Sequence, residues 1–200
     1  MGAYEGRHAL IFAAAPETDY SYIRAFLGEH PDALIACADG GLRHARALGL
    51  HPDFMISDCD SMPETEGDEV IRLKPEKDDT DTMLALREGL RRGCDTFYLY
   101  GATGGARLDH TLANLQSLAF LLRHGARGYL YDQNFVYTAI ENETLTLTRE
   151  VEWGIVSLFS MGDRAEHITL EGLQYPLTDG TIDCGFPLGV SNHIVAPTAR

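Results

Sequence analysis

The sequence has few basic residues. Only 16 of its 200 residues are Lys or Arg, against 30 Asp and Glu, and the formal net charge is −14. Binding to a nucleic-acid backbone depends on Lys and Arg that displace its counterions. A nucleic-acid partner is therefore not expected.

The cysteine and histidine patterns of zinc sites and disulfide frameworks are also missing. The four cysteines are scattered without a C-x-x-C pair, and the eight histidines show neither H-x-x-x-H nor H-x-H spacing. A zinc site and a disulfide framework are therefore not expected. Scattered cysteines in a chain of this size are typical of reduced thiols, so we expect a cytoplasmic protein.

Long apolar runs are absent. No run reaches the roughly 20 residues that a membrane-spanning helix needs. The short apolar run at residues 9–15 carries no convincing cleavage site, which favours a first strand over a signal peptide. An apolar fraction of 44% is enough for a sizeable core.

The first two thirds of the chain alternate between strand-like and helix-like segments. Thr80 is placed to cap the helix at 81–92, with Asp81 in the first turn, where the helix dipole favours negative charge. The pattern predicts an α/β fold, a mainly parallel, doubly wound N-terminal domain. The expected strands are 9–15, 33–38, 54–57, 70–73, 96–100 and 128–131, and the expected helices are 17–27, 41–48, 81–92 and 109–124.

Helical spacing disappears after Tyr131. Short β-rich runs follow one another, separated by Gly, Asn and Asp, which predicts a small all-β sandwich or barrel. We therefore divide the chain into residues 1–132 and 133–200. The expected runs are 135–140, 144–148, 155–159, 167–170 and 189–195.

Aspartates follow most of the predicted strands of the first domain. Ligands bind outside the carboxyl ends of the strands in an open parallel sheet, so these carboxylates are expected at one edge. Like charges gathered there repel one another unless a cation lies among them, and oxygen ligands without His or Cys suit Mg²⁺. The acids are Asp39, Asp58, Asp60, Asp78, Asp81 and Asp109.

Two glycine pairs, at residues 40–41 and 104–105, lie in the predicted loops that also carry Asp39 and Asp109. Each pair allows backbone N–H groups to approach a phosphate closely, although a lone pair is also typical of a simple turn. The guanidinium fork of Arg107 suits two phosphate oxygens, but a surface arginine is the plain alternative. His110 is equally a phosphate ligand or a residue in the first turn of a helix.

Several ordered motifs resemble the thiamine pyrophosphokinase family. The motifs are A-D-G-G (38–41), P-D-F-M-I-S-D-C-D-S (52–61), K-D-D-T-D (77–81), G-A-T-G-G-A-R-L-D-H-T-L-A-N (101–114), G-L-Q-Y-P-L (172–177) and G-V-S-N (189–192). The resemblance implies transfer of a pyrophosphoryl group from ATP to the hydroxyl of thiamine, with release of AMP. It also implies a homodimer whose active site lies between the α/β domain of one subunit and the β-domain of the other.

The resemblance implies roles for individual residues. It assigns the ligands of Mg²⁺, the contacts to ATP, and the residues near thiamine. The metal ligands would be Asp58, Asp60 and Asp81; the ATP contacts Asp39, Lys77, Thr80, Arg107, Asp109 and His110; and the thiamine contacts Tyr175, Ser191 and Asn192. An aspartate would accept the alcohol proton, with Asp78 and Asp81 as candidates.

Two other functions remain open at this point. A glycosyltransferase that uses a nucleotide sugar would explain the D-x-D pair at 58–60, but not K-D-D-T-D or the motifs of the β-rich region. A non-catalytic regulator that binds thiamine or a nucleotide would not need Asp58, Asp60 and Asp81 together.

Overall fold

A computed structural model of the chain describes residues 6–17, 19–57, 67, 69–72, 79–149 and 154–200. The chain divides into two compact units, one that extends to Ala139 and one that begins at Ile140. None of the helices in the described ranges is long and apolar enough to cross a bilayer.

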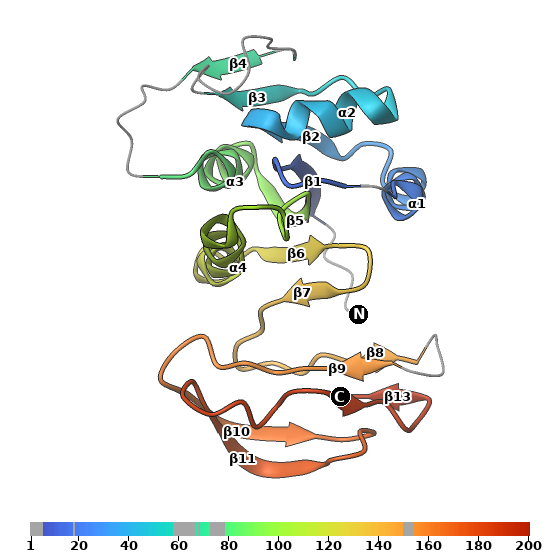
Figure 1. Cartoon of the computed structure of the whole chain (residues 1–200), viewed down its shortest axis with the longest axis vertical. Helices are drawn as coiled ribbons and strands as arrows, with labels where there is room; N and C mark the ends of the chain where they lie inside the picture. The colour runs from blue at the N-terminus through green and yellow to red at the C-terminus, as the bar shows by residue number, and fades with distance from the viewer. Residues whose placement is uncertain (1–5, 18, 58–66, 68, 73–78, 150–153) are drawn as a thin grey trace. The chain divides into compact units, whose positions relative to one another are not determined.

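The first unit is built on one seven-stranded sheet (Figure 1) with the order β4-β3-β2-β1-β5-β6-β7. All neighbouring strands pair in parallel except β6 and β7, which are antiparallel. The strands are β1 (Arg7–Phe12), β2 (Leu34–Ala38), β3 (Phe54–Ser57), β4 (Glu69–Arg72), β5 (Cys94–Tyr100), β6 (Arg127–Tyr131) and β7 (Val136–Thr138).

Helices cover both faces of this sheet, as the alternating pattern predicted. On one face, Ile11 of β1 belongs to the same buried cluster as residues of α3 and α4. On the other face, Phe12 is buried with residues of α1 and α2. The helices are α1 (Ser21–Glu29), α2 (Leu42–Leu48), α3 (Asp81–Arg91) and α4 (Leu108–Arg123).

The strand order places β1 at the point where the winding of the sheet changes direction. From β1 the chain builds outward through β2, β3 and β4, and then returns to pair β5 with the other side of β1. After β1 the chain leads to α1 on one face of the sheet, and after the neighbouring strand β5 it leads to α4 on the other face. Such a switch point is where open α/β sheets bind ligands.

The second unit consists of three two-stranded sheets around a small core of Leu170, Leu173, Ile194 and Ala199. Its sheets pair β10 with β11, β12 with β9, and β13 with β8, all antiparallel. The strands are β8 (Leu147–Thr148), β9 (Ile155–Val156), β10 (Arg164–Leu170), β11 (Leu177–Asp183), β12 (Asn192–His193) and β13 (Thr198–Ala199).

The predicted fold class is confirmed, with a difference where the two units meet in sequence. Residues from 133 onward were predicted to belong to the β-rich domain, whereas β7 pairs with β6 at the edge of the first sheet. Asp132 directs this hairpin, because its Oδ1 accepts hydrogen bonds from the N–H groups of Asn134 and Phe135, both at 2.8 Å. An aspartate that binds the backbone two residues on is typical of a tight turn.

Candidate functional site

Asp39 lies at the carboxyl end of β2, where the chain enters the short 3-10 helix η1 (Asp39–Gly41). Its φ is 46°, a left-handed conformation that costs free energy in a residue with a side chain. Its Oδ1 is buried and has no hydrogen-bond partner among the described residues. A buried carboxylate oxygen without a partner is costly, so this atom fits a bound cation or a polar ligand group. Hard oxygen donors of this kind suit Mg²⁺.

The glycines after Asp39 bring the η1 backbone close to β1. A Cβ on Gly41 would lie 2.0 Å from the carbonyl oxygen of Phe12, and a Cβ on Gly40 would lie 3.2 Å from the Cβ of Ala14. The first distance is far below any real contact, so only glycine fits at Gly41. The A-D-G-G motif therefore sets the spacing between the ends of β1 and β2.

The glycine-rich loop after β5 is held by two other parts of the chain, α4 and the segment after β1. The Nδ2 of Asn114 on α4 donates to the carbonyl of Ala102 at 2.7 Å, and the carbonyl of Gly101 accepts from the N–H of Ala15 at 2.7 Å. Gly104 and Gly105 are exposed, each with a φ of 74°. This conformation suits glycine, and the exposed backbone allows a phosphate to come close.

Arg107 and Asp109 form a bidentate ion pair at the start of α4. Nε and Nη2 of Arg107 donate to the two carboxylate oxygens of Asp109 at 2.9 and 2.6 Å. The hydrogen bonds from Arg107 lower the pKa of Asp109 to about 2. Both side chains are exposed, so the structure joins two predicted ATP contacts in one exposed pair. His110 follows in the first turn of α4 and is also exposed.

Thr80 and Asp81 lie where α3 begins. Oγ1 of Thr80 accepts from the N–H of Met83 at 3.2 Å, which confirms the predicted N-cap. Because α3 leads from β4 to the parallel strand β5, its first turn lies on the side of the sheet where the strands end. Asp81 is thus at the same edge as Asp39 and the glycine-rich loop.

Four predicted site residues, Asp58, Asp60, Lys77 and Asp78, lie outside the described residues. Within the part of the chain that the structure describes, no group of three His, Cys, Asp or Glu side chains is close enough to hold a metal ion. Two of the three predicted metal ligands are among the four undescribed residues.

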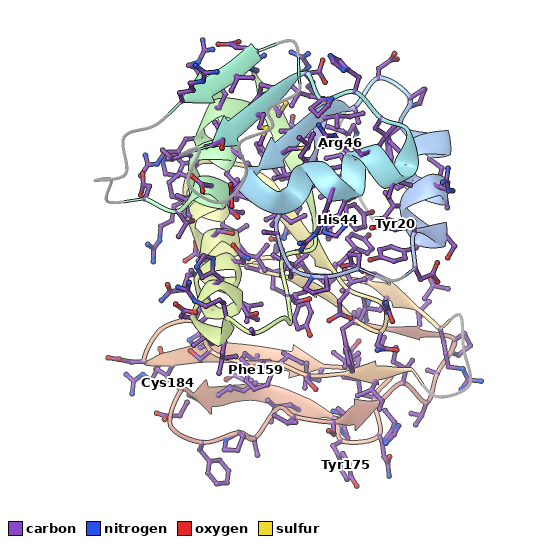
Figure 2. All side chains as sticks on the ribbon, turned by 45° about the horizontal axis from the view of Figure 1, so that its top comes forward. Tyr20, His44, Arg46, Phe159, Tyr175 and Cys184 are labelled. Carbon is purple, nitrogen blue, oxygen red and sulfur yellow. The ribbon has the colours of Figure 1, made fainter. Side chains whose placement is uncertain are left out.

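A polar network beside the switch point was missed by the sequence analysis. His44 of α2 contacts the carbonyl of Ala15 through Nε2 and the hydroxyl of Tyr20 through Nδ1, both at 2.8 Å. Figure 2 shows the side chains of Tyr20 and His44 directed toward each other. Glu17 accepts from the N–H of Gly101 at 3.2 Å and from the hydroxyl of Tyr22 at 3.0 Å. An acid after the first strand, in A-A-A-P-E, was the only signal of this network in the sequence.

The buried His44 and the partly buried His8 make the stability of the fold sensitive to acid. Burial lowers the pKa of both His44 and His8 below the ordinary value of 6.5. Below that pH these histidines bind more protons in the unfolded chain than in the folded chain. The free energy of unfolding is therefore expected to fall as the pH drops. Urea denaturation at a series of pH values from about 5 to 8 measures this slope. His44→Gln is expected to flatten it, and an equal slope in that variant would contradict the assignment to His44.

The predicted thiamine residues lie together in the second unit. Asn192 is buried, and its side-chain amide binds the backbone of Tyr175 twice, accepting from its N–H at 2.9 Å and donating to its carbonyl at 2.7 Å. Tyr175 itself is left 63% exposed. Ser191 is exposed with a φ of 62°, and its N–H donates to Oγ of Ser157 at 3.0 Å.

Tyr175 and Asn192 also line a cavity of about 240 Å³. Most of its walls are apolar. The other lining residues are Leu170, Pro176, Leu177, Ile182, Leu188, Gly189 and Val190. The predicted thiamine residues Tyr175 and Asn192 are thus part of a preformed hollow.

Two family models match the chain in succession. The model described as "Thiamin pyrophosphokinase, catalytic domain" matches residues 30–130, and "Thiamin pyrophosphokinase, vitamin B1 binding domain" matches residues 142–200. Among curated proteins, the thiamine pyrophosphokinase of Bacillus subtilis (strain 168) is 28% identical over 193 residues, which cover 92% of this chain and 88% of that protein.

Solved structures share the fold. The thiamin pyrophosphokinase from Geobacillus thermodenitrificans has a TM-score of 0.79 at 26% identity, covering 96% of this chain and 90% of that one. The Bacillus subtilis enzyme has a TM-score of 0.83 at 24% identity, with 96% and 92% covered. The yeast enzyme has a TM-score of 0.79 at 14% identity, with 99% and 83% covered, which is a likeness of fold alone.

Proposed function

Because the chain belongs to the thiamin pyrophosphokinase family, we propose that it transfers a pyrophosphoryl group from ATP to thiamine, giving thiamine diphosphate and AMP with the help of Mg²⁺. The observation that carries the proposal is the order of the two family matches, a catalytic domain at 30–130 and a vitamin B1 binding domain at 142–200. Each match falls in one of the two compact units.

The first unit would bind ATP and the metal. Asp58, Asp60 and Asp81 would hold Mg²⁺, which neutralises charge on the triphosphate when bound. Support comes from the unpartnered Oδ1 of Asp39 and from the first turn of α3 at the carboxyl edge of the sheet. The ATP contacts would be Asp39, Lys77, Thr80, Arg107, Asp109 and His110.

In the reaction, the hydroxyl oxygen of thiamine would attack the β-phosphorus of ATP. The new O–P bond forms as the bond to the AMP oxygen breaks, and the alcohol proton passes to a carboxylate, either Asp78 or Asp81. Phosphoryl-type transfer needs little covalent help from protein, so positioning and charge neutralisation supply most of the rate. These roles suit a site of carboxylates and backbone N–H groups.

The second unit would bind thiamine through Tyr175, Ser191 and Asn192. The cavity beside Tyr175 has apolar walls suited to an aromatic ligand, and Asn192 holds the Tyr175 backbone in place. Thiamine is cationic, so the net charge of −14 favours its approach. The unit that begins at Ile140 would thus serve thiamine binding and dimerisation, and the unit that extends to Ala139 catalysis.

The protein is expected to be a homodimer whose active site is shared between subunits. Large apolar side chains such as Phe159 and Phe186, 67% and 65% exposed in the single chain, are typical of a surface that a partner covers. Sedimentation equilibrium is expected to give about twice the mass of the 22.0 kDa chain. A fully active monomer would contradict the shared site. Cytoplasmic location is part of the same proposal, since reduced cysteines suit that compartment.

The reaction is tested by following AMP release from MgATP with thiamine. We expect AMP and thiamine diphosphate in equal amounts, and no product when Mg²⁺ is removed by a chelator. Nucleotide sugars are tried in parallel, because turnover of a nucleotide sugar would support the glycosyltransferase instead. Purified protein that binds thiamine but releases no AMP would refute the enzymatic proposal.

A further inference from the structure

The segment that follows β1, residues 13–17, belongs to none of the motifs that define the site, yet α2 holds it at two consecutive carbonyls. The guanidinium of Arg43 donates to the carbonyl of Ala14, and Nε2 of His44 contacts the carbonyl of Ala15 at 2.8 Å. Neighbouring side chains on one helix thus fix neighbouring peptide groups at the switch point of the sheet.

The partners of His44 determine where its proton lies. A carbonyl oxygen can only accept, so Nε2 must carry the proton and donate to Ala15, which leaves Nδ1 to accept from the hydroxyl of Tyr20. The residue is 1% exposed, so water cannot replace either partner. The neutral ring is therefore fully satisfied, and it joins α2 to two points of the loop between β1 and α1, Ala15 and Tyr20.

Glu17 joins the same segment to the glycine-rich loop. One carboxylate oxygen accepts from the buried N–H of Gly101, while the N–H of Ala15 donates to the Gly101 carbonyl. The other oxygen is held by the hydroxyl of Tyr22. Gly101 has a φ of 62°, and a Cβ there would lie 2.6 Å from the carbonyl oxygen of Ala13. The two loops are therefore locked together at close range.

We propose that His44, Tyr20 and Glu17 are positioning residues that hold residues 13–17 as a third wall of the nucleotide site, between the Asp39 loop and the glycine-rich loop. The inference rests on the proposed function for the identity of the ligand. It adds residues that act through the backbone of the loops and touch no reacting atom. Backbone donors must be held to a fraction of an ångström to bind well, and this network supplies that restraint.

The expected signature is a loss of nucleotide affinity without a matching loss of turnover. His44→Ala and Glu17→Ala each leave a buried backbone group without its partner, and should raise the KM for ATP by about tenfold. The kcat at saturating ATP and the KM for thiamine should stay within about twofold, since neither residue contacts thiamine or the transferred group. His44→Gln keeps a donor for Ala15, and Glu17→Gln keeps an acceptor for Gly101, so these variants should recover most of the affinity.

The experiment measures equilibrium binding of Mg²⁺ and α,β-methylene-ATP, in which the bond to be cleaved is blocked, beside steady-state kinetics. His8→Ala is the control, because His8 is a partly buried histidine on β1, the strand that precedes residues 13–17, away from the carboxyl end of that strand. It should lower the melting temperature and leave nucleotide affinity unchanged.

The proposal is overturned if folded His44→Ala and Glu17→Ala bind the analogue within about twofold of the wild type. It is also overturned if His8→Ala weakens binding equally, because the loss would then follow general stability, or if the wild type does not bind the analogue. A wild type that binds the analogue but releases no AMP refutes the proposed function alone, and the binding comparison still decides the role of the network.

Discussion

Asp81→Asn is expected to lower kcat by about 10²-fold or more, as for the loss of a key electrostatic group, while the fold stays intact. Asparagine has the same shape, and the cap that starts α3 comes from Thr80, whose hydroxyl the substitution leaves in place. The variant removes a carboxylate charge at the edge of the sheet where the metal would bind. Steady-state AMP release at saturating MgATP and thiamine measures the effect.

Asp79→Asn is the matched control for Asp81→Asn. Asp79 lies two residues earlier, just before the N-cap of α3, and pairs with Nε of Arg87 on α3 at 3.0 Å. Its removal takes away the same charge from the same region and should change kcat by less than about threefold, as expected for a surface ion pair. Equal losses in both variants would show a general field effect and would remove Asp81 from the set of metal ligands.

The α/β part of the fold could be predicted because its strands are buried on both faces. Phe54–Ser57 was predicted with its observed bounds, since a short apolar run between turn residues is typical of a central parallel strand. α3 was equally readable, because its cap and its first acidic residue precede a clear apolar stripe. In these segments local preference and tertiary packing agree.

The β-rich part was harder to predict because its strands bury little. β11 was missed: only Ile182 of its seven residues is buried, and its sequence L-T-D-G-T-I-D lacks a regular apolar alternation. It pairs with β10 through two register shifts, which disturb the alternation of both strands. β13 was also missed, because a strand of two residues is too short to show an apolar alternation.

The candidate site divides along similar lines. Motif residues such as Asp39 and the glycine pairs are close in sequence to the strands that position them. The predicted strands were therefore enough to place these residues at the edge of the sheet. The network of Glu17, Tyr20 and His44 joins residues 24 or more positions apart. Each is ordinary in its own segment, and only the pairing of β1 with both β2 and β5 brings them together.

Gly41→Ala is expected to have the largest effect on stability, about 3 kcal/mol in the free energy of unfolding, as for overpacking of a tight interior. The new Cβ would lie 2.0 Å from the carbonyl oxygen of Phe12 and 2.5 Å from its carbonyl carbon. Both are backbone atoms of the central strand, so no side-chain rotation relieves the clash and η1 must move away from β1. Because Asp39 moves with it, nucleotide binding should be lost even in the fraction that folds.

Gly28→Ala provides the control for Gly41→Ala. Gly28 lies within α1, and a Cβ there would meet no other atom within 4 Å. Alanine favours a helix more than glycine does, so this variant should gain about 0.5–1 kcal/mol and bind nucleotide normally. Urea denaturation gives both free energies at one pH and temperature. A Gly41→Ala protein as stable as Gly28→Ala would mean that the ends of β1 and β2 can separate without cost, and the close spacing of the A-D-G-G loop would then not be what builds the site.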